Sequence, residues 1–102
     1  MPDLSYAFSD PPLLVMASLA DGPKHGHAML DDIETMCGTR PGPGTLYGAI
    51  ARLEKQGLIE ALAVDDRRRP YQLTADGHAD FAARMAALQR FVAIGVARVA
   101  PA

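Results

Sequence analysis

Residues 41–73 read PGPGTLYGAIARLEKQGLIEALAVDDRRRPYQL, and this stretch decides the fold. It opens with a proline–glycine turn, and Pro43 suits the first turn of a helix because that position needs no amide donor. Leu46, Ile50 and Leu53 then recur at the spacing of one helical face, which must point inward. We therefore predict a helix from Pro43 with a small, polar outer face. That face consists of Gly44, Thr45, Tyr47, Gly48, Ala51, Arg52 and Lys55.

The second half of the stretch indicates a β-hairpin. The helix is expected to end at Gly57, and residues 58–64 form a short apolar run. Residues 65–69 form a charged turn with three arginines, and residues 71–73 alternate between apolar and polar side chains. Two such runs around a charged turn predict a hairpin that carries arginines at its tip.

Two more helices are predicted before this stretch. Asp10 can cap a helix whose first residues are prolines, and Gly22 ends that helix. A second helix is expected from about residue 26 to residue 37, because its apolar residues share one face, and Gly38 ends it. The face consists of Met29, Leu30, Ile33, Met36 and Cys37.

A long final helix follows the hairpin. Thr74 can cap it, and it is expected to run from about Ala75 to Val99. Its apolar residues alternate between spacings of four and three, as in a coiled-coil seam, and a second stripe widens the face beyond what one small domain covers. We therefore predict a homodimer. The expected interface is Phe81, Met85, Leu88, Phe91, Val92, Gly95 and Val99.

Composition sets the class of protein. The chain has 102 residues, of which 49% are hydrophobic and 22% charged, which is typical of one folded domain. The net charge of -2 is unlike that of a general nucleic-acid binder, but residues 40–69 hold six basic side chains against four acidic ones. The sequence has one cysteine, and it contains neither an apolar run long enough to span a membrane nor a signal peptide. These features predict a cytoplasmic protein associated with the bacterial nucleoid.

The order of these elements predicts a function. Three short helices, a hairpin and a long helix are typical of a winged helix-turn-helix, a mainly α fold with a small β-hairpin (α+β). We expect a DNA-binding domain over residues 10–74 and a dimerisation helix over residues 75–100. In such a domain the third helix enters the major groove and the wing contacts neighbouring backbone or minor groove. The expected DNA-binding residues are Lys24, His25, Thr45, Tyr47, Gly48, Arg52, Lys55, Arg67, Arg68 and Arg69.

Each of these contacts has a structural alternative. Thr45 can have the single role of a hydrogen-bonding residue at the helix N-terminus. Tyr47 can be a half-buried core residue, and the arginines can form an ordinary solvated turn. Capping or packing at the start of the second helix would equally explain Lys24, His25 and His27.

Several motifs together resemble the PadR-like transcriptional regulators. They are Gly22-Pro23-Lys24-His25-Gly26-His27, Pro43-Gly44-Thr45-Leu46-Tyr47, Arg52-Leu53-Glu54-Lys55-Gln56-Gly57-Leu58-Ile59 and Arg67-Arg68-Arg69-Pro70-Tyr71-Gln72-Leu73-Thr74-Ala75-Asp76-Gly77. The resemblance implies a winged helix, a dimer formed through the carboxy-terminal helix, and repression from palindromic operators. In some members a small molecule releases the DNA. The chain departs from the usual pattern at His27, where tyrosine is common, at Ala51, where a basic residue is common, and in having no tryptophan.

Other classes of function have less support. Neither a phosphate-binding glycine loop nor a serine elbow nor a paired metal motif occurs in the sequence, so we expect neither an enzyme nor a cofactor. A metal-responsive regulator would use His25, His27, Cys37 and His78, with Asp31 and Asp32. A winged helix that binds protein and not DNA is the other alternative. The expected partners are double-stranded DNA, a second copy of the chain and a small-molecule effector, with no membrane.

Overall fold

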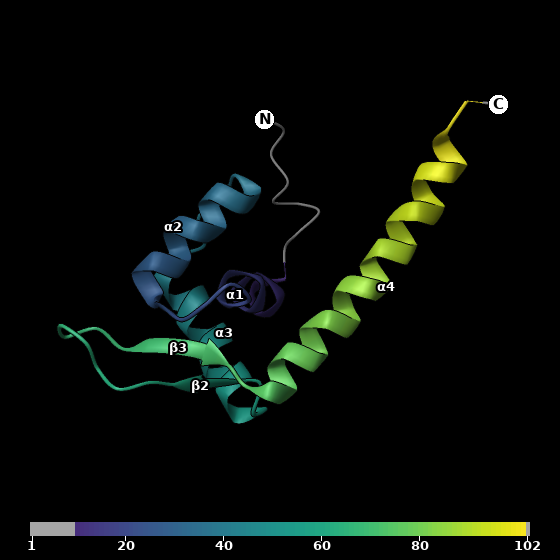
Figure 1. The fold of residues 1–102 in the computed structure, drawn as a ribbon. Helices are drawn as coiled ribbons and strands as arrows, with labels where there is room; N and C mark the ends of the chain where they lie inside the picture. Colours follow the sequence, from purple (N-terminus) through teal and green to yellow (C-terminus); the bar gives the residue numbers. More distant parts are fainter. Residues whose placement is uncertain (1–9, 102) are drawn as a thin grey trace.

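The structure is a computed structural model that describes residues 10–101. Its helices and hairpin follow the predicted order (Figure 1). One short strand, β1, is added to them. The elements are α1 (Pro11–Leu19), β1 (Lys24–His25), α2 (Gly26–Cys37), α3 (Pro43–Lys55), β2 (Ile59–Ala61), β3 (Pro70–Leu73) and α4 (Ala75–Val99). The winged helix-turn-helix fold predicted from the sequence is thereby confirmed.

Local capping explains why the helices begin and end where predicted. The Asp10 carboxylate accepts a hydrogen bond from the Leu13 amide at 3.2 Å, and the Thr74 hydroxyl accepts one from the Gly77 amide at 3.0 Å. Gly38 ends α2 with φ at 79°, a left-handed conformation that costs glycine little. Each of these caps depends on residues no more than four positions apart.

The sheet has three antiparallel strands in the order β1-β3-β2. Leu73 pairs with Ile59, and Tyr71 has Ala61 on one side and Lys24 on the other. Strand β1 was not predicted, because two residues carry no periodicity. Its pairing with β3 ties the start of α2 to the wing, which is the loop and hairpin of residues 59–73.

The wing turns back at two residues that both have positive φ. Asp65 and Arg68 are bridged, and between them Asp66 has φ 49° and Arg67 has φ 64°. A tight hairpin turn of this kind normally carries asparagine or glycine at these positions. The wing therefore presents a charged tip in a conformation that bulky side chains adopt at a cost.

The core lies between α1, α2, α3 and the sheet. Leu46, Ile50 and Leu53 are buried in it as predicted, together with Val15, Met16, Leu19, Met29, Leu30, Ile33, Cys37, Ala49, Ile59 and Leu73. Met36 corrects the prediction for α2, because it is 41% exposed although it was expected to face inward. Met36 lies at the edge of the apolar face of α2, and within residues 10–101 no element buries that edge.

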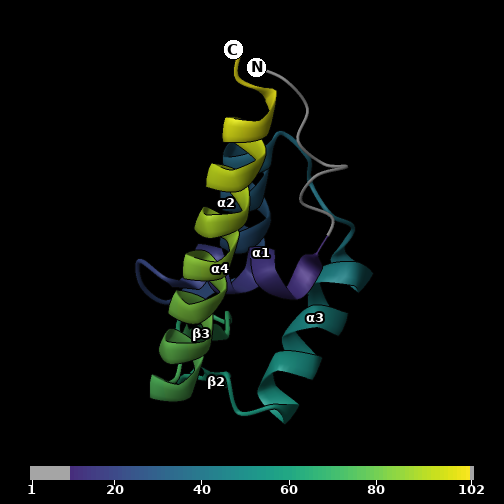
Figure 2. The same cartoon turned by 90° about the vertical axis from the view of Figure 1, so that its right-hand side faces the viewer.

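Helix α4 projects away from this core. The principal extents are 56 × 28 × 20 Å and the radius of gyration is 15.0 Å, above the roughly 13 Å typical of a compact chain of this length. Figure 1 shows α4 leaving the sheet and diverging from α1 and α2, and Figure 2 shows it passing in front of them. Phe81, which was predicted to lie in the dimer seam, is partly buried and packs against the core of its own chain.

Candidate nucleic-acid interface

The outer face of α3 is exposed and small, as predicted. Gly44, Thr45, Gly48, Ala51, Arg52 and Lys55 are all exposed. A methyl group built at Gly44 or Gly48 would meet no atom within 4 Å outside the helix backbone. At these two glycines, another molecule can therefore approach the backbone of α3 closely.

Tyr47 connects α3 to the start of α2. A Cβ atom built on Gly26 would lie 2.3 Å from the Tyr47 hydroxyl and 2.8 Å from the ring carbon that bears it. The ring thus lies across the backbone of Gly26, yet 51% of the residue is exposed. Sequence reasoning missed this contact, because Tyr47 lies 21 positions away from Gly26 in the chain.

His25 caps α2 and also approaches the wing. Its Nδ1 accepts a hydrogen bond from the Ala28 amide at 3.2 Å, which is the capping role left open by the sequence. Its Nε2 lies 3.2 Å from a guanidinium nitrogen of Arg68. The pairing of β1 with β3 brings these two side chains together although 43 positions separate them.

The three arginines of the wing have different surroundings. Arg69 donates a hydrogen bond to the Leu62 carbonyl at 2.7 Å and so braces the base of the turn. Arg68 lies beside His25, and Arg67 is exposed at the tip. All three arginines are therefore exposed, and Arg69 has a structural bond to the backbone as well.

A concavity of about 190 Å³ lies where α2, α3 and the wing meet. It is lined by His25, Gly26, His27, Tyr47, Arg67, Arg68, Arg69 and Tyr71, with no acidic side chain among these residues of the described chain. Asp65 and Asp66 line the neighbouring concavity instead. Burial raises the pKa of the Tyr71 hydroxyl above its ordinary value, and the negative charge of Glu54 acts in the same direction.

Lys24 does not share this outward orientation. Its ammonium group donates to the Ser18 carbonyl and to the Asp21 carboxylate, and it lies 3.8 Å from Asp32. The Ser18 hydroxyl is itself buried and donates to Asp32 at 2.7 Å. Lys24, expected to bind DNA, instead ties the end of α1 to α2, and we leave it out of the proposed DNA surface.

Replacing Lys24 with methionine is expected to lower the free energy of unfolding by about 1.5–3 kcal/mol, the usual scale for hydrogen bonds to a charged group. Methionine keeps the apolar stem but leaves the Ser18 carbonyl and Asp32 without the ammonium. Urea titration followed by circular dichroism measures the change. Affinity for duplex DNA should change by less than about twofold, and a tenfold loss would return Lys24 to the DNA surface.

The candidate metal ligands do not assemble into a site. Within residues 10–101, no three side chains of histidine, cysteine, aspartate or glutamate come close enough to hold one ion. Cys37 is buried and donates to the Ile33 carbonyl, and His27 lies near Asp31 and Arg40 on the surface. In the same described part of the chain, no helix is both long and apolar enough to cross a membrane.

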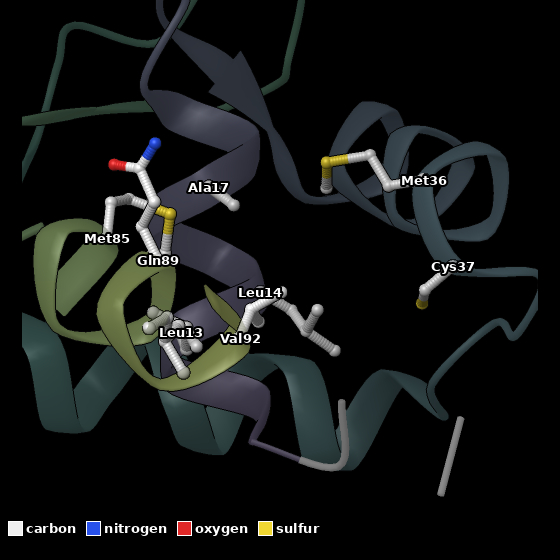
Figure 3. A pocket seen from close by; sticks show the side chains of 9 residues that line it. Leu13, Leu14, Ala17, Met36, Cys37, Met85, Gln89 and Val92 are labelled. Atoms are coloured by element: carbon white, nitrogen blue, oxygen red, sulfur yellow. The ribbon is translucent and has the colours of Figure 1, made fainter. Parts of the chain in front are cut away.

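A second surface feature is an apolar groove of about 390 Å³ between α1, α2 and α4 (Figure 3). It is lined by Leu13, Leu14, Ala17, Met36, Cys37, Met85, Leu88, Gln89 and Val92. The exposed Met36 lies on one wall and Met85 on the opposite wall. Beyond Val92, α4 carries further exposed apolar side chains, namely Ile94, Val96 and Val99.

Comparison with known proteins identifies a family. Residues 15–83 match the model of the PadR-like family of transcriptional regulators. An uncharacterised 37.1 kDa protein in transposon TN4556 of Streptomyces fradiae is 49% identical over 69 residues, which cover 68% of this chain. The chain spans about a fifth of that relative, because the match covers 20% of its length.

Solved structures share the fold. A transcriptional regulator from Clostridium thermocellum superposes with a TM-score of 0.78 at 21% identity, over 98% of this chain and 100% of that one. A PadR family regulator from Clostridium difficile gives 0.72 at 22% identity, over 86% and 95% of the two chains. A PadR family regulator from Eggerthella lenta gives 0.73 at 24% identity, over 94% and 86%.

Proposed function

The chain belongs to the PadR-like family of transcriptional regulators, and we propose that it represses transcription by binding an inverted-repeat DNA operator as a homodimer. The observation that carries this proposal is the exposed outer face of α3 beside the arginines of the wing. Membership of a family of regulators also supports the expectation that the chain is not an enzyme.

The outer face of α3 has the size and chemistry that a major groove accepts. The groove of B-DNA is about 12 Å wide and admits an α-helix. Gly44, Gly48 and Ala51 allow the helix backbone to approach closely, while Arg52 and Lys55 in its last turn supply positive charge. Thr45 and Tyr47 add hydroxyl groups that can donate to phosphates or base edges.

The homodimer is proposed from the exposed apolar face of α4. Phe91 is 73% exposed and Val99 is 82% exposed, which a helix free in water would not favour. This face is continuous with the groove between α1, α2 and α4, because Met85, Leu88 and Val92 belong to both. A second copy can cover both surfaces at once.

The symmetry of such a dimer determines how the two half-sites of the operator are oriented and spaced. Two recognition helices related by a two-fold axis read two inverted half-sites, spaced by about one helical turn, ~34–36 Å, or a multiple of it. Release of the DNA by a small-molecule effector stays a prediction of the sequence.

Removing Arg67 and Arg68 from the wing tests the proposal. The double variant Arg67→Ala, Arg68→Ala should bind duplex DNA on the order of tenfold more weakly, and the dependence of log affinity on log salt should flatten by about 0.9 for each lost phosphate contact. Fluorescence anisotropy with a labelled duplex from the chain's own upstream region measures both. The matched control Arg90→Ala, Arg98→Ala removes the same charge from α4.

The result separates the alternatives. An equal loss in the two double variants would mean that only net charge matters and would remove the wing from the interface. A wild-type protein that does not bind the duplex at low salt would contradict DNA binding and favour a winged helix that binds protein.

A further inference from the structure

His25 faces more hydrogen-bond donors than it can accept. A neutral imidazole has one acceptor nitrogen and one N–H group. Its Nδ1 faces the Ala28 amide at 3.2 Å and its Nε2 faces the Arg68 guanidinium at 3.2 Å, and both of these groups are donors. When Nδ1 accepts the hydrogen bond from the Ala28 amide, Nε2 must carry the proton of the neutral ring. The N–H group of Nε2 then faces an N–H group of Arg68, and neither can accept. Protonation of the ring would make both nitrogens donors.

An acceptor oxygen that faces both His25 Nε2 and the Arg68 guanidinium from the concavity would resolve this arrangement. The concavity beside them holds about 190 Å³, room for several water-sized groups and so for one phosphodiester. The Tyr47 hydroxyl reaches the same place from α3, since it lies against Gly26 in the first turn of α2. Three donors from three elements converge there, at the positive end of a helix.

The charge around the concavity selects the sign of the ligand. Arg67 and Arg69 add to its positive lining, whereas Asp65 and Asp66 line a neighbouring concavity that His25 and Arg68 also border. A ligand with several acceptor oxygens and a negative charge satisfies all of these groups together.

We propose that this concavity is a clamp for one phosphate of the DNA backbone, whose oxygens accept from His25 Nε2, the Arg68 guanidinium and the Tyr47 hydroxyl. The proposal rests on the proposed DNA binding and assigns a single phosphate to side chains of β1, α3 and the wing. The clamp couples the wing to the capped end of α2, so that the wing takes a fixed position when DNA is bound.

A double-mutant cycle tests the clamp. His25→Asn keeps a capping oxygen for the Ala28 amide but removes the imidazole N–H, and Arg68→Gln removes the guanidinium. Each single variant should weaken binding of a labelled 30-bp mixed-sequence duplex by about 3- to 10-fold at low salt, because each loses a charge-assisted hydrogen bond. The double variant should bind about as weakly as the weaker single variant, since both residues hold the same phosphate.

Tyr47→Phe and Arg98→Gln complete the design. Tyr47→Phe keeps the ring over Gly26 and should weaken binding severalfold in the wild-type background, but less in the Arg68→Gln background. Arg98→Gln removes a charge far along α4 and should add its small effect independently of His25. All variants should keep the helical circular dichroism of the wild type.

The outcomes separate the clamp from DNA binding itself. If the losses from His25→Asn and Arg68→Gln simply multiply, the clamp is refuted and DNA binding by the wing stands. If inorganic phosphate below 1 mM competes with the duplex, the concavity is a site for free anions and not a DNA clamp. If the wild-type chain does not bind the duplex at all, the proposed function fails and the clamp fails with it.

Discussion

Replacing Gly77 with alanine is expected to lower the free energy of unfolding by about 3 kcal/mol or more, a large part of the roughly 5–15 kcal/mol that stabilises a domain. Gly77 is buried in the first turn of α4, and a Cβ atom there would lie 1.9 Å from the Leu58 carbonyl oxygen. That carbonyl cannot simply move, because it accepts the Thr74 amide at 3.1 Å. Alanine must therefore push α4 away from the turn between α3 and β2.

Gly48→Ala is the matched control. It makes the same change inside a helix, but nothing lies within 4 Å of the new methyl group. Alanine should there stabilise the protein by about 0.5–1 kcal/mol, because glycine loses more backbone entropy on folding. Urea unfolding of both variants at one protein concentration measures the contrast. Two effects of the same sign and size would mean that α4 does not pack on Leu58 as described.

These two glycines show which parts of the fold the sequence could predict. Helix ends were predicted well, because Asp10, Pro43 and Thr74 act on neighbours within one turn. Gly26 and Gly77 could not be interpreted, because the atoms that a Cβ would meet there come from distant parts of the chain, the Tyr47 ring and the Leu58 carbonyl respectively. A glycine in a helix looks the same in the sequence whether its hydrogen atom meets solvent or a carbonyl group.

The candidate interface also has a part that the sequence could predict and a part that it could not. Periodicity alone placed the outer face of α3 correctly, because burial of Leu46, Ile50 and Leu53 leaves the opposite side exposed. Lys24 and Arg68 carry the same charge, but Lys24 folds back onto Ser18 and Arg68 meets His25 across the sheet. Charge can be counted in a sequence, whereas the direction of a charged side chain depends on partners that only the tertiary structure supplies.

Val92→Glu is expected to dissociate the proposed homodimer, with a rise in the dissociation constant on the order of 100-fold or more. In the single chain Val92 is 56% exposed at the edge of the apolar groove, so a glutamate can stay hydrated there and the monomer fold is kept. In the dimer the same carboxylate would be buried against apolar side chains without a partner, which costs several kcal/mol. Sedimentation velocity over a range of protein concentrations measures the shift.

Ala86→Glu is the control, because it adds the same charge to the exposed opposite side of α4 and should leave the dimer intact. Its carboxylate stands four residues before Arg90, an arrangement that mildly favours the helix. The Val92→Glu monomer should also bind duplex DNA much more weakly than the wild type, since one recognition helix replaces two linked ones. A Val92→Glu protein that sediments as a stable dimer would show that a different surface joins the two copies. The apolar half of α4 would then require another partner.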